Sequence, residues 1–288
     1  MTITDDKTVS ERRRLGTLDD EPELEVSVVI PCYNETKRLG IMLEDTVPFL
    51  KANFSKSWEI LLVDDGSKDG TGQFALEWGL KHQLAESTLR VCRLSTNRGK
   101  GGAVTHGMKY ARGKYIIFAD ADGASKFPDI LKLLDAVKKS TKNDANRPAV
   151  AIGSRAHMVK TDAVVKRSFI RNFLMYGLHT LLYLFGIRTI GDTQCGFKLF
   201  TRAASRQIFP YMHTEGWIFD VEILIIAMRK NIPVSEVAIS WHEVEGSKIE
   251  LAKDSIRMAI DLIVMRCAYF LGIYNETRVS QTKTKKVQ

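Results

Sequence analysis

Acidic side chains follow two apolar runs of the sequence at the point where each run ends. Asp64 and Asp65 lie at the end of EILLVD (59–64), and Asp120 and Asp122 lie at the end of YIIFAD (115–120). Side chains two residues apart on an extended chain point to the same side, so Asp120 and Asp122 can bind one hard cation. With few other protein ligands, that cation would share its coordination with the oxygens of a bound diphosphate. The spacing predicts a divalent metal site, although aspartates also cap turns.

Two cationic side chains lie close to other predicted elements. Lys100 belongs to GKGG (99–102), which opens a predicted helix, where its ammonium and the backbone N–H groups can meet phosphate oxygens. The alternative for Lys100 is a solvated position at the helix start. Arg155 follows the apolar run AVAIG (149–153), and a guanidinium can bind a phosphate through two hydrogen bonds. These residues favour a ligand that carries phosphate.

The elements that must position these side chains alternate along the chain. Short apolar runs rich in β-branched residues predict buried parallel strands, and the helix-period segments between them predict crossover helices. The predicted strands are VSVVIP (26–31), EILLVD (59–64), RVCRL (90–94), YIIFAD (115–120) and AVAIG (149–153), and the predicted helices cover 36–53, 70–82, 100–111 and 128–139. The pattern is typical of an α/β fold with a doubly wound, Rossmann-like, mostly parallel sheet. Ligands of such sheets bind beyond the carboxyl ends of the strands.

The strand ends also lack features that other function classes need. No GxGxxG follows the first strand, and GKGG lacks the GxxxxGK[ST] spacing, so neither dinucleotide-dependent hydride transfer nor a P-loop NTPase is favoured. The 42 Lys and Arg residues against 34 Asp and Glu give a net charge of +8, which attracts phosphates. No nucleic-acid-binding motif accompanies this charge, so we expect no nucleic-acid partner. The four cysteines form no CxxC pair, which predicts reduced, buried thiols and no structural zinc.

Several longer motifs resemble those of one enzyme family. VSVVIPCYNE, EILLVDDGSKDGT, NRGKGGAV and FADADGASKFPD resemble the successive signatures of the family 2 glycosyltransferases, which have the GT-A fold. The later segments GSRAH (153–157), DTQCGFKLF (192–200), FDVE (219–222) and the GSK that ends at Lys248 resemble the polyprenyl-phosphate branch. The resemblance covers roughly residues 24–274. It implies an inverting enzyme that moves glucose from UDP-glucose to dolichyl phosphate, giving dolichyl β-D-glucosyl phosphate for protein N-glycosylation.

The resemblance also implies roles for individual residues. Asp120 and Asp122 would hold Mg²⁺ or Mn²⁺, and the residues implied in the reaction are Asp122, Arg155 and Asp192. The residues implied in donor binding are Pro31, Tyr33, Glu35, Val63, Asp65, Lys100, Asp120 and Ala121. The cations available for the acceptor phosphate are Arg155, Arg167, Arg171 and Lys248.

The acceptor chemistry sets what the protein must supply. A lipid phosphate has a second pKa of about 6, so it is largely ionised at pH 7 and needs no general base. The remaining work is to hold two anions for in-line attack on C1, which favours cationic clamps. We therefore expect Asp192 to orient the sugar, with the capping of a turn or helix as the alternative. His242 stands where related mannosyltransferases carry arginine, so its role stays open, and Asp220 and Glu222 are expected to be a buried structural pair.

Two segments are amphipathic and favour membrane contact. In 165–187 basic residues precede an apolar run too short to span a membrane, and in 249–274 the charges follow one stripe. The alternative is a core helix for 165–187, and packing on its partner segment for the C-terminal helix. We expect tails at 1–24 and 275–288, a GT-A domain at 25–248 that includes 165–187, and a C-terminal amphipathic helix at 249–274. The sequence shows neither a secretory signal nor the N-terminal spanning helix that family members usually carry. The resemblance implies the cytosolic face of the endoplasmic reticulum membrane.

Two alternatives stay open at this point. A mannosyltransferase that uses GDP-mannose carries heavily overlapping motifs, and these residues do not determine which base is bound. A non-catalytic nucleotide-sugar-binding protein would use the same pocket, although both aspartates of Asp120-Ala121-Asp122 are present. The sequence predicts no oligomeric state.

Overall fold

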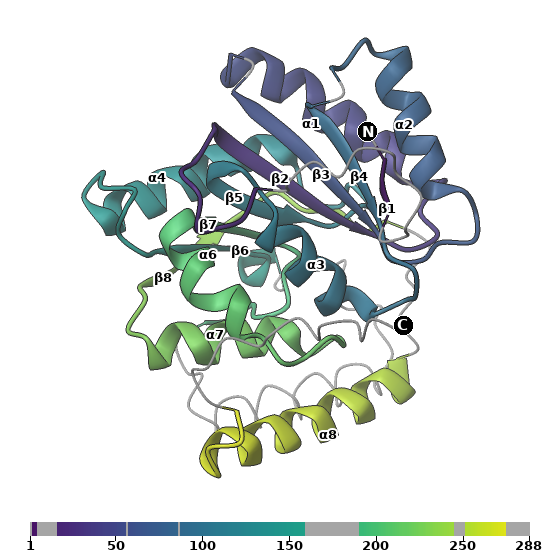
Figure 1. Cartoon of the computed structure of the whole chain (residues 1–288). Helices are drawn as coiled ribbons and strands as arrows, with labels where there is room; N and C mark the ends of the chain where they lie inside the picture. Colours follow the sequence, from purple (N-terminus) through teal and green to yellow (C-terminus); the bar gives the residue numbers. More distant parts are fainter. Residues whose placement is uncertain are drawn as a thin grey trace, which may run out of the picture.

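The computed structural model describes residues 2–4, 16–55, 57–85, 87–158, 190–244 and 251–274. Within these residues, eight strands form one mixed sheet in the order β1-β4-β3-β2-β5-β7-β6-β8 (Figure 1). The strands are β1 (Thr2–Thr4), β2 (Leu24–Cys32), β3 (Trp58–Asp64), β4 (Leu89–Arg93), β5 (Gly113–Ala119), β6 (Val150–Ser154), β7 (Phe197–Thr201) and β8 (Val234–Ala238). All five predicted strands are present, and β1, β7 and β8 were not predicted.

The strand β7 changes the topology that the sequence predicts. The strands β4, β3, β2 and β5 are parallel, but β7 pairs antiparallel with β5 on one side and with β6 on the other. The predicted parallel strand at 149–153 therefore has a parallel neighbour only in β8. The prediction missed β7 because the fully buried Lys198 interrupts its apolar run.

Helices cover both faces of the sheet, as a doubly wound fold requires (Figure 1). One face packs against α1 (Leu39–Asn53), α2 (Thr71–Lys81) and α4 (Ile130–Thr141). The other packs against α3 (Gly99–Lys109), α6 (Arg202–Ile208) and α7 (Phe219–Arg229). Short 3-10 turns lie at Phe127–Asp129, Ala156–Met158 and Phe209–Tyr211. Alternate residues of a strand face opposite sides, so Val28 and Ile30 lie in one core and Val29 in the other.

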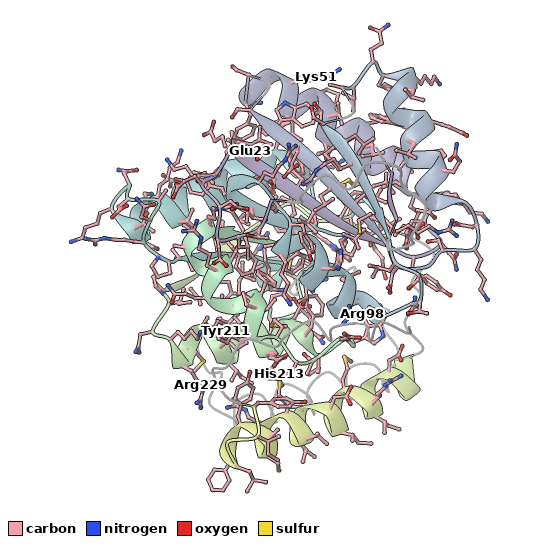
Figure 2. All side chains as sticks on the ribbon, in the orientation of Figure 1. Glu23, Lys51, Arg98, Tyr211, His213 and Arg229 are labelled. Atoms are coloured by element: carbon pink, nitrogen blue, oxygen red, sulfur yellow. The ribbon has the colours of Figure 1, made fainter. Side chains whose placement is uncertain are left out.

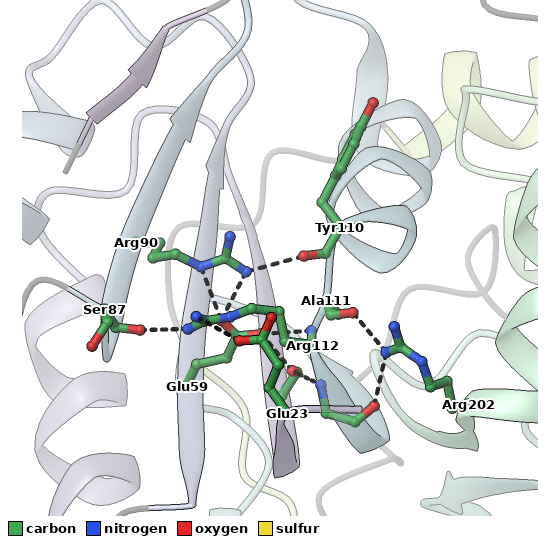
Figure 3. A network of polar contacts seen from close by, with 10 residues as sticks. Glu23, Glu59, Ser87, Arg90, Tyr110, Ala111, Arg112 and Arg202 are labelled. Atoms are coloured by element: carbon green, nitrogen blue, oxygen red, sulfur yellow. Dashed lines mark hydrogen bonds and ion pairs between the residues drawn. The ribbon is translucent and has the colours of Figure 1, made fainter. Parts of the chain in front are cut away.

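At the amino-terminal edge of the parallel strands, the buried carboxylate of Glu59 is fully engaged (Figure 3). Its Oε1 accepts hydrogen bonds from Ser27 Oγ at 2.6 Å and from the Arg112 N–H at 2.8 Å. Its Oε2 accepts hydrogen bonds from Arg90 Nε and Arg112 Nε, each at 2.9 Å. Two guanidiniums thus neutralise one buried acid, which ties β2, β3 and β4 together.

Residues 16–23, which we expected to belong to an N-terminal tail, are part of the packed domain. Leu18 is buried in the core, and the backbone oxygens of Thr17 and Asp20 accept hydrogen bonds from Arg202 at 2.6 and 3.0 Å. Arg206 donates a further hydrogen bond to the Asp20 oxygen at 2.9 Å. This packing could not be predicted from the sequence, because the contacts with Arg202 and Arg206 are made to backbone oxygens.

The helix α8 (Leu251–Phe270) lies outside α7, across one side of the molecule (Figure 1). Leu262, Met265 and Ala268 are buried against the core. Near the end of the helix, the Tyr269 hydroxyl donates to Glu222 Oε1 at 3.0 Å, and His213 lies between α7 and α8 (Figure 2). Among the described residues, no helix combines the length and the apolar character needed to cross a membrane.

Candidate active site

The site is built around Asp120, the first residue after β5. Its backbone N–H donates to the Gly196 oxygen at 3.0 Å, which fixes the chain just beyond the end of β5. Its Oδ1 lies 2.7 Å from Nζ of Lys100, which comes from the first turn of α3. Burial alone would lower the pKa of Lys100, but the charges of Asp120 and Asp220 raise it, so the ammonium is retained.

Asp122 lies beside Asp120 with one oxygen unengaged by the described residues. Its Oδ1 accepts a hydrogen bond from the Ala124 N–H at 3.0 Å. Burial and the negative charge of Asp120 raise the pKa of Asp122. Two carboxylates that oppose each other's ionisation form a site that a cation would stabilise. The two carboxylates therefore interact electrostatically, and their binding of one cation stays a prediction.

Arg38 adds a cation that the sequence analysis did not single out. Both oxygens of the buried Glu35 accept its hydrogen bonds, from Nη2 at 2.6 Å and from Nε at 2.8 Å. These bonds and the charges of Asp122 and Asp120 raise the pKa of Arg38, so its guanidinium lies within electrostatic reach of the aspartate pair. Glu35, expected in the donor pocket, therefore has both carboxylate oxygens engaged by Arg38. The i, i+3 spacing of Glu35 and Arg38 was the available sequence signal.

Asp65 lies at the end of β3, where the base of a donor was expected. Its Oδ1 accepts a hydrogen bond from the Arg98 N–H at 2.7 Å. Burial raises the pKa of Asp65 to about 6, against the effect of the N–H groups of Arg98 and Gly99. Tyr33 is 37% exposed at the same edge of the sheet. A carboxylate and an exposed aromatic ring are suited to a flat ring that carries an N–H group.

Three other predicted donor residues are buried and contribute differently. Val63 belongs to the core beneath α3, and Ala121 belongs to the core on the opposite face. Pro31 is buried at the end of β2, where it pairs with Val63 across the strands. These residues shape the edge of the sheet, whereas Tyr33 and Asp65 carry its polar chemistry.

The glycines of GKGG pack closely against the 215–219 segment. A Cβ on Gly99 would lie 2.6 Å from the Glu215 oxygen, and a Cβ on Gly101 would lie 2.5 Å from Cβ of Phe219. The Gly102 N–H donates to the Glu215 oxygen at 3.1 Å, so it is not open to a ligand. Nζ of Lys100 lies 5.8 Å from the ring centroid of Trp217, and its contact with donor phosphates stays a prediction.

A second pair of charges lies behind Lys100. Lys198 and Asp220 are buried and hydrogen-bonded to each other. Asp220 also raises the pKa of Lys100 through its charge. Opposite charges therefore alternate from Asp120 through Lys100 and Asp220 to Lys198. Asp220 and Glu222 are both buried, as predicted, and they have separate partners, since Glu222 accepts hydrogen bonds from the 213–214 segment and from α8.

Arg155 was expected to bind a phosphate with two hydrogen bonds. In the structure it forms this bidentate pair with Asp192. Nε and Nη2 of Arg155 donate to the two carboxylate oxygens at 2.7 and 2.8 Å, and the Arg155 N–H donates at 2.9 Å. Although burial acts the other way, these bonds lower the pKa of Asp192 and raise that of Arg155. Nη1 of Arg155 makes no hydrogen bond to a described residue. The guanidinium lies 5.4 Å from the ring centroid of Trp241.

Trp241 and His242 lie beside the 124–125 segment, in a backbone pairing that the sequence does not predict. The segment around Trp241 forms a bridge with Ser125, and the His242 N–H donates to the Ala124 oxygen at 3.0 Å. His242 is exposed. Arg167, Arg171 and Lys248 lie outside the described residues, as does the segment 165–187.

The aspartate pair fits a divalent cation on the chemistry of its donors. Carboxylate oxygens are ligands that Mg²⁺ and Mn²⁺ accept, and Asp122 keeps one oxygen without a partner among the described residues. No group of three or more His, Cys, Asp or Glu side chains in the described part of the chain could hold a metal alone. A cation here would therefore take its other ligands from a substrate or from water.

Comparisons with known proteins agree with this geometry. Residues 27–209 match the family described as glycosyl transferase family 2. A dolichyl-phosphate beta-glucosyltransferase of Saccharomyces cerevisiae is 58% identical over 269 residues, which cover 92% of this chain and 80% of the yeast protein. A dolichyl-phosphate beta-glucosyltransferase of Homo sapiens is 41% identical, covering 95% of this chain and 83% of its own.

Solved structures show the same fold. Glucosyl-3-phosphoglycerate synthase from Mycobacterium tuberculosis, in complex with Mn²⁺, UDP-glucose and phosphoglyceric acid, superposes with a TM-score of 0.54 at 17% identity, covering 85% of this chain and 80% of its own. Mannosyl-3-phosphoglycerate synthase from Rubrobacter xylanophilus superposes with a TM-score of 0.59, covering 89% and 77%. The chain belongs to glycosyl transferase family 2 and, within it, to the dolichyl-phosphate beta-glucosyltransferases.

Proposed function

We propose that this chain transfers glucose from UDP-glucose to the phosphate of dolichyl phosphate with inversion at C1. The observation that carries the proposal is that Asp120, Asp122, Lys100 and Arg155 lie together at one edge of the sheet. The relatives of this chain are named dolichyl-phosphate beta-glucosyltransferases. The charge of Asp120 contributes to the raised pKa of both cations, so both lie near the aspartate pair.

The donor would bind with its base at Asp65 and its diphosphate at the aspartate pair. The ionised Asp65 accepts an N–H from uracil, and the Tyr33 ring packs on the base. Asp120 and Asp122 would hold Mg²⁺ or Mn²⁺, which supplies positive charge for the departing diphosphate. Lys100 and Arg38 add fixed positive charge on the protein side.

The acceptor phosphate would meet Arg155 through Nη1. Asp192 holds the other edge of the guanidinium by two hydrogen bonds, so Arg155 approaches its ligand in one orientation. This assigns Asp192 to the orientation of Arg155 rather than of the sugar. Arg167, Arg171 and Lys248 remain proposed as further cations for the same phosphate.

No protein base is required in this scheme. Asp192 has a lowered pKa and is a poor proton acceptor at pH 7. The acceptor phosphate is itself largely ionised above a pH of about 6. The chain's own residues therefore bind, orient and charge-balance the two anions, and one phosphate oxygen attacks C1 while UDP leaves.

The exposed face of α8 supports a membrane partner. Ile256, Ile260 and Val264 are 58%, 55% and 55% exposed, and Phe270 at the end of the helix is 90% exposed. These apolar side chains point away from the buried Leu262 and Met265, so this face of α8 does not pack on the core. We propose that this face lies in the cytosolic leaflet of the endoplasmic reticulum, where the lipid acceptor is found.

The test is a transfer assay with purified protein, Mg²⁺ or Mn²⁺ and a short polyprenyl phosphate. We expect transfer from UDP-glucose and little from GDP-mannose. Preference for GDP-mannose would contradict the donor assignment, and nucleotide binding without transfer to any phosphate acceptor would contradict the enzymatic assignment.

Vesicle binding tests the role of α8. Replacing Ile256, Ile260 and Ile263 by serine should weaken binding to vesicles by at least about tenfold, with the melting temperature unchanged, because these side chains are exposed. Leu262→Ser is the matched control, since this buried side chain should instead affect stability. Unchanged vesicle binding by the triple variant would remove α8 from the membrane contact.

A further inference from the structure

Gly196 lies directly against the carboxylate of Asp120. A Cβ on Gly196 would lie 2.0 Å from Oδ2, 2.2 Å from Cγ and 2.5 Å from Oδ1 of Asp120. These separations are far below van der Waals contact, so the glycine and the carboxylate cannot both keep their places once a side chain is added. Gly196 does not have a positive φ, so its backbone conformation does not require glycine.

The chain on either side of Gly196 is anchored and cannot easily move back. Nζ of Lys198 donates to the Cys195 oxygen at 2.6 Å and pairs with Asp220. Cys195 and Lys198 are 1% and 0% exposed. Phe197 pairs with Ala119, the residue before Asp120, in the antiparallel ladder of β5 and β7.

We infer that Gly196 is a positioning residue of the donor site, which sets where the Asp120 carboxylate stands against Lys100 and the bound donor. The anchored segment limits how far the Asp120 carboxylate can move back. The carboxylate fills the space that a side chain at position 196 would occupy. An alanine there would displace Asp120 toward the ligand and away from its ion pair with Lys100. The inference rests on the proposed donor site.

The first measurement is the affinity for UDP in the presence of Mn²⁺, determined by calorimetry. Gly196→Ala should lower this affinity by at least about tenfold. Gly16→Ala is the matched control, because its nearest neighbouring atom lies 3.9 Å from an added Cβ. Wild-type protein that does not bind UDP would refute the proposed function. Wild-type protein that binds, with Gly196→Ala equal to it, would refute the inference.

A double-mutant cycle then shows whether the clash is with Asp120. In an Asp120→Ala background the carboxylate is gone, so adding Gly196→Ala should leave the melting temperature unchanged, whereas the same change in the wild-type background should lower it. If Gly196→Ala alone does not fold, the double variant should fold. An equal loss of stability in both backgrounds, or a double variant that also fails to fold, would mean that the anchored segment itself is disturbed and would overturn the inference.

Discussion

The two edges of the parallel sheet treat buried carboxylates in opposite ways. At the amino-terminal edge, Glu59 has four hydrogen bonds and two guanidinium partners (Figure 3). At the carboxyl-terminal edge, burial raises the pKa of both Asp65 and Asp122, so their ionised forms are not fully compensated. The interactions at the first edge stabilise the fold. At the second edge, carboxylates whose charge is not fully compensated can interact with a ligand.

The largest expected effect is on stability and lies at the amino-terminal edge. Glu59→Gln would leave Arg90 and Arg112 without their shared counter-charge, and breaking such a buried pair costs about 3–5 kcal/mol of unfolding free energy. UDP affinity below the melting transition should not change. Chemical denaturation measures the loss, with Glu23→Gln as control, because its contact with Arg112 is exposed. A Glu59 variant that is stable but fails to bind UDP would break the comparison.

The next effect is on turnover and lies at the other edge. Asp122→Asn should lower turnover by about 10²–10³-fold, because it removes a preorganised charge at the reaction centre. It should not lower stability at pH 7, since the raised pKa of Asp122 means that ionisation opposes folding. Turnover and thermal melting are measured together. The exposed Asp135→Asn serves as control, and a strong loss of stability in Asp122→Asn would place this residue with Glu59.

Asp192 combines features of both edges, since it is paired like Glu59 but lies at the site. Asp192→Asn should reduce turnover by roughly ten- to a hundred-fold through looser orientation of Arg155, the usual range for one charged hydrogen bond. Its rate should still rise with pH as the acceptor phosphate ionises near a pH of about 6. An inactive variant that binds both substrates at every pH would make Asp192 essential to the chemistry.

The smallest effect is the pH dependence that Asp65 produces. Its pKa is raised from 3.8 to about 6, so the folded state holds the proton more tightly than the unfolded state, and stability falls as pH rises through this window. Uridine affinity should rise over the same window, because the ionised form accepts the base N–H. Asp65→Asn should remove both slopes. Titration with uridine avoids phosphate ionisation, and unchanged slopes in the variant would exclude Asp65 as their source.

Much of the site could be predicted because its acids follow strand ends in the sequence. The run before Asp120 is continuous, and the i, i+2 spacing of Asp120 and Asp122 fixes a common direction on an extended chain. The four crossover helices could be predicted because local hydrophobic periodicity indicates them. One thiol differs from expectation, because Cys267 lies on the exposed side of α8.

The features that could not be predicted depend on contacts between distant residues. Gly196 comes directly before β7, whose apolar run is broken by a buried lysine, and it lies against Asp120 at the end of β5. The ion pair of Arg155 joins residues 37 positions apart, and Asp192 carries no local pattern that names its partner. Trp241 reaches Arg155 only because its segment bridges to Ser125. Each of these contacts joins segments that the folded chain brings together and that no local sequence pattern links.

The place of β7 in the sheet also governs the order in which the protein can fold during its synthesis. The strands β2, β3, β4 and β5 lie within residues 24–119 and are neighbours in the sheet, so they can pair with one another before the rest of the chain is made. The strand β6 must wait for β7 and β8, which are made about 40 to 80 residues later, and until then β5 is an open edge. If Gly196 positions Asp120 as we infer, a nascent chain can hold half of its sheet and still lack the proposed nucleotide site. Nucleotide binding would therefore report that β7 has joined the sheet.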